Sequence, residues 1–360
     1  MTSLTLDHLR CYAVARSLFT PTTLQKAITR LGFVQADPIR APARAQDLTL
    51  RHRVHNYRAG DLERRYAQLA VEEDFFVNYG FLPQRTHQLL HPRTAGTVWP
   101  DARVEQAQAV LSFVRERGVV HPREVDAQFQ HGKSQNWFGG SSNASTQLLD
   151  GMHYRGLLRV HSRDSGTRTY AARDVHDAVA DPAAALDALV DVVVQKYAPL
   201  PASTLSGLVM RLQHAAPQWS ALRRAAWQRA KTRLPSATVE GTVWYWPAGE
   251  NPLGKRHVLD DELRLLAPFD PVVWDRRRFE AFWGWAYRFE AYTPAPKRVR
   301  GYYALPLLWR GQVIGWGNLA VRAGVLHSEL GFVAGKAPRE AAFKLALQAE
   351  LARLEHFLGL

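Results

Sequence analysis

Apolar positions recur with helical spacing through the central part of the chain. In residues 101–118 they return every three or four positions, which predicts an amphipathic helix ending near a glycine. A short strand with a second helix is predicted over 119–129, and a third helix over 146–158. Residues 157–172 then alternate apolar and polar on both sides of Ser165-Gly166, which is typical of a β-hairpin. Three helices followed by a basic hairpin predict a winged helix-turn-helix.

Weaker copies of this pattern flank the central module. Residues 183–247 contain three helical segments, the last of them basic, followed by an extended pair. Two further amphipathic helices are predicted over 5–18 and 22–32. We therefore expect helix-turn-helix modules repeated in tandem.

From residue 262 onward the pattern changes to strands separated by Pro and Gly turns, and a final helix is predicted over 338–359. The sequence thus predicts an α+β chain with three tandem winged helix-turn-helix modules and a small C-terminal β-barrel that carries a terminal helix. The boundaries that we expect are 1–95, 96–178 and 179–258 for the modules and 259–360 for the barrel.

The composition of the chain indicates what kind of molecule it binds. The chain has 360 residues, too many for one ordinary core, and its 46% hydrophobic content is that of a folded protein. Lys and Arg number 46 against 33 Asp and Glu, so the formal net charge is +13. Such an excess attracts polyanions, and nucleic acid is the most abundant polyanion in a cell.

Several kinds of site are excluded or unsupported. The single cysteine, Cys11, cannot build a disulfide framework, an iron–sulfur cluster or a cysteine-based zinc site within one chain. The 14 histidines do not show HExxH spacing, so neither a metal nor another cofactor is predicted. Because no signal-like segment and no run of about 18 apolar residues is found, we expect a cytoplasmic protein without a membrane segment.

The stretch "FVQADPIR", residues 33–40, brings in candidate chemistry. Gln35 and Asp37 stand two positions apart and Pro38 follows. Residues two apart in an extended segment point the same way, so a carboxamide and a carboxylate could face one water molecule. Alternatively, Asp37 caps a turn before Pro38 and Gln35 lies on an exposed strand face. The residues by themselves leave both interpretations open.

Three phrases of the chain resemble a known family: "LGFVQADPI", "LLAPFDPVVWDRRR" and "YTPAPKRVRGYYALPLLWRGQVIG". They are similar to the winged-helix DNA glycosylases of the YcaQ/AlkZ type, and the resemblance covers nearly the whole chain. It implies three winged helices and a C-terminal β-barrel around double-stranded DNA. It also implies hydrolysis of the N-glycosidic bond of N7-alkylguanine, including the unhooking of interstrand crosslinks.

The resemblance makes Gln35 and Asp37 the catalytic motif. One branch of the family carries Gln-x-Gln there and is narrow in its substrates. The Gln-x-Asp branch, which this chain resembles, accepts nitrogen-mustard crosslinks and simple N7 adducts. One position departs from the family pattern, because Val77 stands where a histidine is expected.

The residue types suit this chemistry. An N7-alkylguanine is already a cationic leaving group, so the reaction needs no general acid. A carboxylate such as Asp37 can stabilise the oxocarbenium-like sugar and activate water, while Gln35 can position that water. No lysine stands in an evident nucleophile position, so we expect a monofunctional enzyme. The alternative is a non-catalytic DNA-binding regulator, which would normally be a dimer, whereas one chain around a duplex suggests a monomer.

Basic residues near these features are expected to contact DNA phosphates. They are Arg44, Arg51 and Arg53 after the motif, Arg159, Arg163 and Arg168 on the predicted wing, and Lys297, Arg298 and Arg300 in segment 293–303. This last segment either enters the minor groove or merely solvates a turn of the barrel. The arginines of 276–278 are expected to pair with Asp270 or Glu280, and the tryptophans of segments 243–247 and 281–287 are expected in the core rather than as base-stacking platforms.

Overall fold

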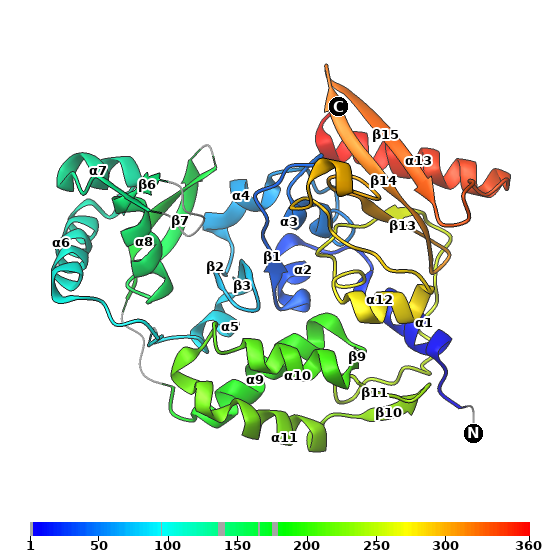
Figure 1. Cartoon of the computed structure of the whole chain (residues 1–360), viewed down its shortest axis with the longest axis horizontal. Helices are drawn as coiled ribbons and strands as arrows, with labels where there is room; N and C mark the ends of the chain where they lie inside the picture. Colours follow the sequence, from blue (N-terminus) through cyan, green and yellow to red (C-terminus); the bar gives the residue numbers. More distant parts are fainter. Residues whose placement is uncertain (1–2, 95, 136–140, 165, 175–178) are drawn as a thin grey trace. The chain divides into compact units, whose positions relative to one another are not determined.

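The computed structural model describes residues 3–94, 96–135, 141–164, 166–174 and 179–360 (Figure 1). The chain forms two compact units. The first comprises Met1–Leu62, Asp191–Gly207 and Ala230–Leu360, and the second comprises Glu63–Val190 and Leu208–Arg229. Helices α9 (Pro182–Tyr197) and α11 (Arg223–Arg233) each continue from the second unit into the first.

The beginning of the first unit leads the chain into the Gln35–Asp37 motif. Helix α1 (Leu6–Ser17) starts at Thr5, whose side chain accepts the N–H of His8, and α2 (Leu24–Leu31) ends at Gly32 with φ 69°. This left-handed conformation suits glycine and turns the chain sharply after the helix. Strand β1 (Val34–Gln35) and helix α3 (Ala45–Leu50) follow. The position of the motif is thus determined by the end of helix α2 rather than by a long strand.

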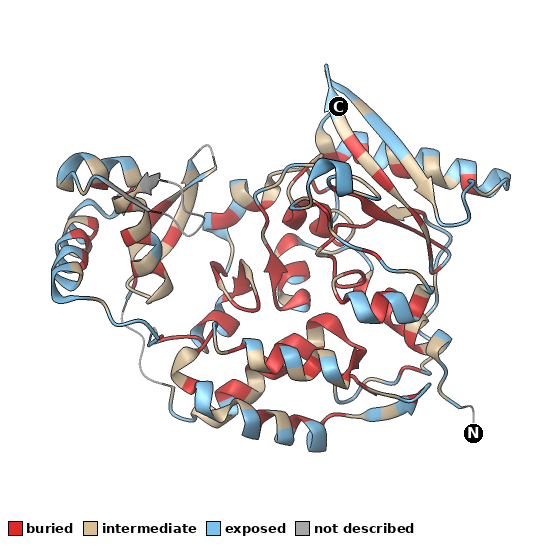
Figure 2. Ribbon diagram, in the orientation of Figure 1, coloured by how far each residue is buried: buried red, intermediate tan, exposed pale blue. Residues whose placement is uncertain are grey.

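The end of the chain forms an antiparallel sheet within the first unit. Its strands, in spatial order, are β12 (Arg264–Leu265), β13 (Leu305–Trp309), β14 (Gln312–Arg322) and β15 (Val325–Phe332). Helix α13 (Ala341–Leu358) packs on it through Phe343, whose ring centroid lies 5.3 Å from that of Trp309. In Figure 2, β13 is buried along its length, whereas β15 is exposed or half-buried.

The predicted β-barrel is wrong. Within the described residues this sheet stays open, because β12 and β15 do not pair with each other. Closure requires tilted strands that are hydrogen-bonded all the way round, and an edge strand of only Arg264–Leu265 is too short for that. The core instead lies where α1 and the sheet meet α12 (Arg276–Trp283), and it includes Val14, Val273, Phe279 and Leu308.

A smaller sheet also belongs to the first unit. Its antiparallel strands are β9 (Leu200–Pro201), β10 (Ser236–Val239) and β11 (Thr242–Tyr245). Helix α10 (Ala202–Arg211) begins in the first unit and ends in the second, η2 (Pro217–Leu222) belongs to the second unit, and η3 (Ala295–Lys297) belongs to the first. Tryptophans are largely core residues as predicted, since Trp244 and Trp246 are buried. The indole N–H groups of Trp283 and Trp285 donate to the backbone carbonyls of Gly311 and Val313.

The second unit contains the predicted central module. Its elements are α6 (Asp101–Arg117), β4 (Val119–Val120), α7 (Pro122–Phe129), α8 (Ala144–Tyr154), β7 (Leu158–Asp164) and β8 (Thr167–Ala172). The strands pair antiparallel in the order β4-β8-β7, and this succession of elements is that of a winged helix. The three helices and the hairpin strands are therefore confirmed, while Ser165 of the hairpin turn lies outside the described residues. The number of modules and their boundaries stay predictions.

The second unit also contains two further hairpins and several short helices. One hairpin pairs β2 (Val71–Phe75) with β3 (Tyr79–Pro83), and the other pairs β5 (Lys133–Gln135) with β6 (Ser141–Asn143). The helices are α4 (Asp61–Arg65), which begins in the first unit, η1 (Tyr66–Gln68) and α5 (Gln84–Gln88). Val77 lies between β2 and β3 and its apolar side chain is buried.

Candidate active site

Gln35 and Asp37 occupy a nearly buried position at the end of β1. Each side chain is 9% exposed. The backbone N–H of Asp37 donates to Oε1 of Gln46, a buried residue of α3, over 3.2 Å. This bond joins the motif to the helix that follows it, so the position of the carboxylate is fixed by the local fold.

The carboxylate of Asp37 does cap the turn at Pro38. Its Oδ1 accepts the backbone N–H of Ile39 over 2.9 Å. Its Oδ2 accepts no hydrogen bond from any residue that the structure describes. Burial raises the pKa of Asp37, and the Ile39 hydrogen bond opposes the shift. Oδ1 of Asp37 therefore holds the turn, as the alternative interpretation predicted, but Gln35 is buried rather than on an exposed strand face.

The carboxamide of Gln35 is oriented by a residue far along the chain. The indole Nε1–H of Trp274 donates to Oε1 of Gln35 over 3.2 Å. The Trp274 ring packs at 4.5 Å from the ring of Tyr197, which is buried. Because the indole can only donate, it selects the amide orientation with oxygen toward Trp274 and nitrogen away from it.

An aromatic and basic segment, residues 290–303, lies beside the motif. Burial, and after it the negative charge of Asp37, raises the pKa of both Tyr292 and Tyr303. The segment is held by Glu290, whose Oε2 accepts the backbone N–H of Arg300 over 2.8 Å and those of its two neighbours. Tyr292 is 79% exposed and Val299 is 75% exposed. The segment thus places Tyr292 and Tyr303 near the carboxylate, and it carries the exposed side chains of Tyr292 and Val299.

The arginines that follow the motif are largely engaged within the protein. Arg53 is fully buried and forms a two-pronged ion pair with Asp270, at 2.7 and 3.0 Å. Arg51 pairs with the buried Glu350 and donates to the carbonyl of Leu265. Arg53 and Arg51 therefore hold the first unit together, and their expected role as phosphate contacts is corrected. Arg44 is half-buried immediately before α3.

The predicted wing arginines are paired with acidic residues of the second unit. Arg159 lies 2.9 Å from Glu72, and Arg163 pairs with Glu73. Arg168 lies 3.2 Å from Glu73 and 2.9 Å from Asp150. Because these charges already have partners, contact with DNA would require them to exchange an internal carboxylate for a phosphate.

The three basic residues of segment 290–303 are more available. Lys297 is exposed and forms no ion pair with the residues that the structure describes. Arg298 lies over the ring of Tyr302 at 5.0 Å, and Arg300 lies near the rings of Trp285 and Trp316, at 4.9 and 5.5 Å. No carboxylate pairs with these guanidinium groups within the described chain.

Other predicted pairs differ in their partners. Arg278 is fully buried as expected, but it donates to backbone carbonyls, including those of Pro199 and Val272 at 3.3 and 3.2 Å. Asp270 is instead taken by Arg53. The sequence therefore indicated the interior location of Arg278 but not its bonding.

A buried lysine near the motif was missed by the sequence analysis. Nζ of Lys196 donates to the backbone carbonyl of Phe33 over 2.5 Å. Burial, and then the positive charge of Arg53, lowers the pKa of Lys196 to about 7. Lys196 ends an otherwise apolar helical pattern, and such a position normally places a lysine in solvent.

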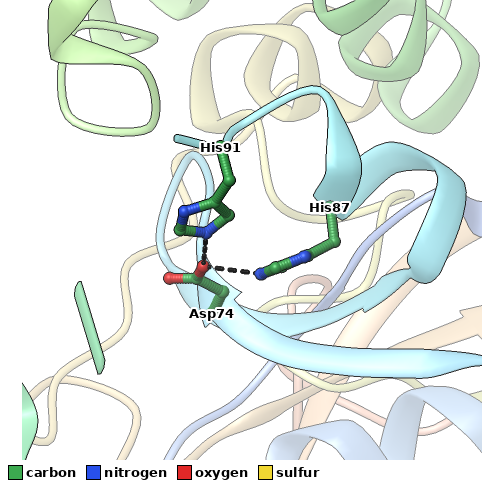
Figure 3. A group of neighbouring side chains, drawn as sticks. All are labelled: Asp74, His87 and His91. Carbon is green, nitrogen blue, oxygen red and sulfur yellow. Dashed lines mark hydrogen bonds and ion pairs between the residues drawn. The ribbon is translucent and has the colours of Figure 1, made fainter. Parts of the chain in front are cut away.

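Asp74, His87 and His91 form a buried cluster that has the residue types of a metal site (Figure 3). Both imidazole Nε2 atoms lie within hydrogen-bond distance of the same oxygen of Asp74, at 2.9 and 2.8 Å. The guanidinium of Arg93 donates to the other oxygen over 3.0 Å. Burial lowers the pKa of both histidines, which are therefore neutral and can donate. The carboxylate is satisfied by protein donors, and Arg93 supplies the positive charge that a metal would bring.

Comparison with known proteins identifies the family to which the chain belongs. The sequence model of the AlkZ-like DNA glycosylases matches residues 28–357, so the chain belongs to the AlkZ-like DNA glycosylase family. It is thus an enzyme of DNA repair with DNA as its substrate, rather than a non-catalytic regulator. The fold resembles that of the DNA glycosylase AlkZ of Streptomyces sahachiroi, with a TM-score of 0.64 and 13% identity, over 100% of this chain and 98% of that one. Among the described residues, none of the helices has the length and hydropathy to cross a membrane.

Proposed function

We propose that this DNA glycosylase hydrolyses the N-glycosidic bond of N7-alkylguanine in duplex DNA, with Asp37 and Gln35 as its catalytic residues. The observation that carries the proposal is the bonding of Asp37. Its carboxylate is buried and fixed through Oδ1, while Oδ2 has no partner among the described residues. A fixed carboxylate with one unengaged oxygen suits the stabilisation of a cationic sugar.

In this mechanism the substrate supplies the leaving group. The alkylated imidazole ring is cationic, so the bond between C1′ and the base breaks without protonation of the base. Asp37 stabilises the positive charge that develops on the sugar and accepts a proton from the attacking water. Gln35, with its oxygen turned toward Trp274, directs its amide N–H group at that water.

We also propose that interstrand crosslinks of the nitrogen-mustard type are accepted. A crosslinked guanine is tethered to the opposite strand and cannot leave the stack fully, as the substrates of base-flipping enzymes do. The enzyme must then open the duplex in place. Segment 290–303 suits this task, because Tyr292 is exposed near Asp37 and the segment also carries the exposed Val299 and the unpaired charge of Lys297. Apolar side chains of this kind can wedge between base steps in the minor groove.

Three other features belong to the proposal. The chain acts as a monomer in the cytoplasm. Three winged-helix modules dock the duplex, and the wing carrying Arg159, Arg163 and Arg168 contacts the backbone. Val77, in place of the family histidine, makes the enzyme slower or differently selective.

Base release from a duplex that carries a single N7-methylguanine tests the function. Wild type should release the base in single-turnover assays, and Asp37→Asn should be slower by roughly 10²-fold or more. Asp101→Asn is the matched control, because it makes the same chemical change at an exposed helix start. Affinity for an undamaged duplex is measured for each variant, so that a lost contact is not mistaken for lost chemistry.

A nitrogen-mustard crosslink replaces the simple adduct in the second arm. Unhooking by wild type and its loss on Tyr292→Ala/Val299→Ala, with release of N7-methylguanine retained, would support the wedge. Equal release by wild type and Asp37→Asn would refute the catalytic assignment.

A further inference from the structure

The first unit contains a hollow of about 250 Å³ that the catalytic proposal does not use. Its walls come from the ends of α1, α2 and α9 and from residues 250–257. Its charged lining residues are Arg16, Arg30, Lys196, Glu250 and Arg256. Four of these five carry a positive charge when protonated.

The only acidic residue that lines this hollow, within the described chain, is already neutralised. Glu250 forms a two-pronged ion pair with Arg16, at 2.8 and 3.1 Å, and accepts the hydroxyl of Tyr12 over 2.6 Å. Burial alone would raise the pKa of Glu250, but the Arg16 hydrogen bond and charge lower it, so the carboxylate is ionised. Glu250 therefore balances Arg16 and has no capacity left for a second cation.

Arg30 and Arg256 have no such partner. Both are exposed, and neither forms an ion pair or a side-chain hydrogen bond with the residues that the structure describes. The Arg30 guanidinium lies over the ring of Phe19 at 4.1 Å, which fixes its direction. Burial, and then the charges of Arg16 and Arg256, lowers the pKa of Arg30. The guanidinium groups thus repel one another across the hollow, and an anion would relieve that repulsion.

An adjoining hollow of about 300 Å³ shares Arg30 and Arg256 but not the charge excess. Its acidic residues, Asp260 and Glu262, both pair with Arg264, at 2.6 and 3.0 Å. The uncompensated charge is therefore concentrated at the two shared arginines.

We propose that this arginine hollow, defined by Arg16, Arg30 and Arg256, binds a phosphate group. Planar guanidinium groups match the oxygens of a phosphate, and several arginines around one anion are a common way to hold it. The hollow has room for the phosphate and part of the ester that carries it. The phosphate belongs either to the DNA backbone or to a free phosphate compound.

An anion bound in the hollow would lie close to the segment that leads into the Gln35–Asp37 motif, because one lysine contacts both. Lys196 at its floor donates to the carbonyl of Phe33, two positions before Gln35. The anion site is thus one hydrogen bond away from the strand that carries the motif. The inference does not depend on the catalytic role of Asp37, because it rests on a separate set of residues.

The test compares two double variants of the full-length protein. Arg30→Gln/Arg256→Gln removes the unpaired charges of the hollow. Arg322→Gln/Arg339→Gln is the control, because it removes two exposed arginines that form no ion pair with the described residues. Both variants lower the net charge equally.

In the first arm, unfolding temperature is measured with pyrophosphate against chloride at equal ionic strength. In the second arm, affinity for an undamaged duplex is measured over a salt series. A stabilisation by pyrophosphate that the hollow variant loses and the control keeps supports the site. If the slope of log affinity against log salt also falls by about two beyond the control, the occupant is the DNA backbone.

If the slope does not change, the occupant is a free phosphate compound. Behaviour of the hollow variant identical to that of the control in both arms would overturn the proposal. Arg256→Gln alone, in an exposed segment, serves the same comparison against Arg322→Gln should the double variant fail to fold.

Discussion

Replacing Asp37 by Asn should stabilise the protein at neutral pH while it removes activity. The Asp37 carboxylate is buried, and burial raises its pKa. The charged form, which the proposed mechanism requires, is therefore less favourable in the folded protein than in the unfolded chain. Asparagine has nearly the same shape and keeps an oxygen that can accept the Ile39 N–H.

The size of the effect follows from two opposing contributions. The variant loses a charge-assisted hydrogen bond worth about 1.5–3 kcal/mol and keeps a neutral one worth about 0.5–1.5 kcal/mol. It also no longer has to bury a charge, and because burial outweighs the Ile39 hydrogen bond in the pKa of Asp37, this relief is the larger contribution. We expect a gain of about 1 kcal/mol in the free energy of unfolding at pH 8.

The gain should depend on pH in one direction. Because the folded pKa of Asp37 lies above the unfolded value of about 3.9, wild-type Asp37 favours folding at low pH and loses that contribution as pH rises through the folded pKa. Asn does not titrate. The advantage of the variant should therefore be largest at pH 8 and shrink toward zero as pH falls to about 4.

Urea unfolding followed by tryptophan fluorescence measures this advantage at pH 5, 6.5 and 8. Asp101→Asn, an exposed carboxylate, is the control and should change little at any of the three pH values. A less stable Asp37→Asn protein at pH 8, or a gain that does not vary with pH, would refute the reasoning that burial of this charge is unfavourable.

Three further changes test other parts of the structure. Trp274→Phe keeps an aromatic ring but removes the indole N–H that donates to Gln35. Single-turnover base release should therefore fall between about tenfold and a hundredfold, while DNA affinity stays unchanged. An unaltered rate would mean that the indole does not orient the amide. Arg53→Met leaves the Asp270 carboxylate buried without its cationic partner, so the free energy of unfolding measured in urea titrations should fall by about 3–5 kcal/mol. A loss below about 1 kcal/mol would contradict the importance of the ion pair. Dialysis against a chelator should leave activity and unfolding temperature unchanged, since Asp74 is satisfied by protein donors; a loss that zinc restores would identify the cluster as a metal site.

Local signals in the sequence were sufficient for the helices and for the hairpin strands of the central module. Apolar spacing over 101–118 and alternation over 157–172 predicted α6, β7 and β8, because each depends on neighbours within a few positions. Barrel closure depends instead on whether the outer strands reach each other. The alternation of residues along β14 is the same in an open sheet and in a barrel, so the sequence pattern could not distinguish them.

The candidate site shows the same division. The two-residue spacing of Gln35 and Asp37 did not decide between a shared water and an exposed strand face, whereas the structure shows that both residues are buried. Their partners could not be predicted, since Trp274 lies 239 positions from Gln35. Arg53 looked like a surface residue in a polar run, but Asp270, 217 positions away, meets it in the interior. Long-range pairs of this kind leave no periodic trace in the sequence.

The long-range contacts that hold β1 have a consequence for how the enzyme folds during synthesis. Lys196 and Trp274, which hold the backbone at Phe33 and the amide of Gln35, are synthesised long after the motif itself. During synthesis, β1 and the segment after it that carries Asp37 therefore precede most of the residues that will surround them. Contacts so distant along the chain form slowly, and we expect the site to mature last during folding. A nascent or prematurely terminated chain would then lack the contacts that Lys196 and Trp274 make with Phe33 and Gln35.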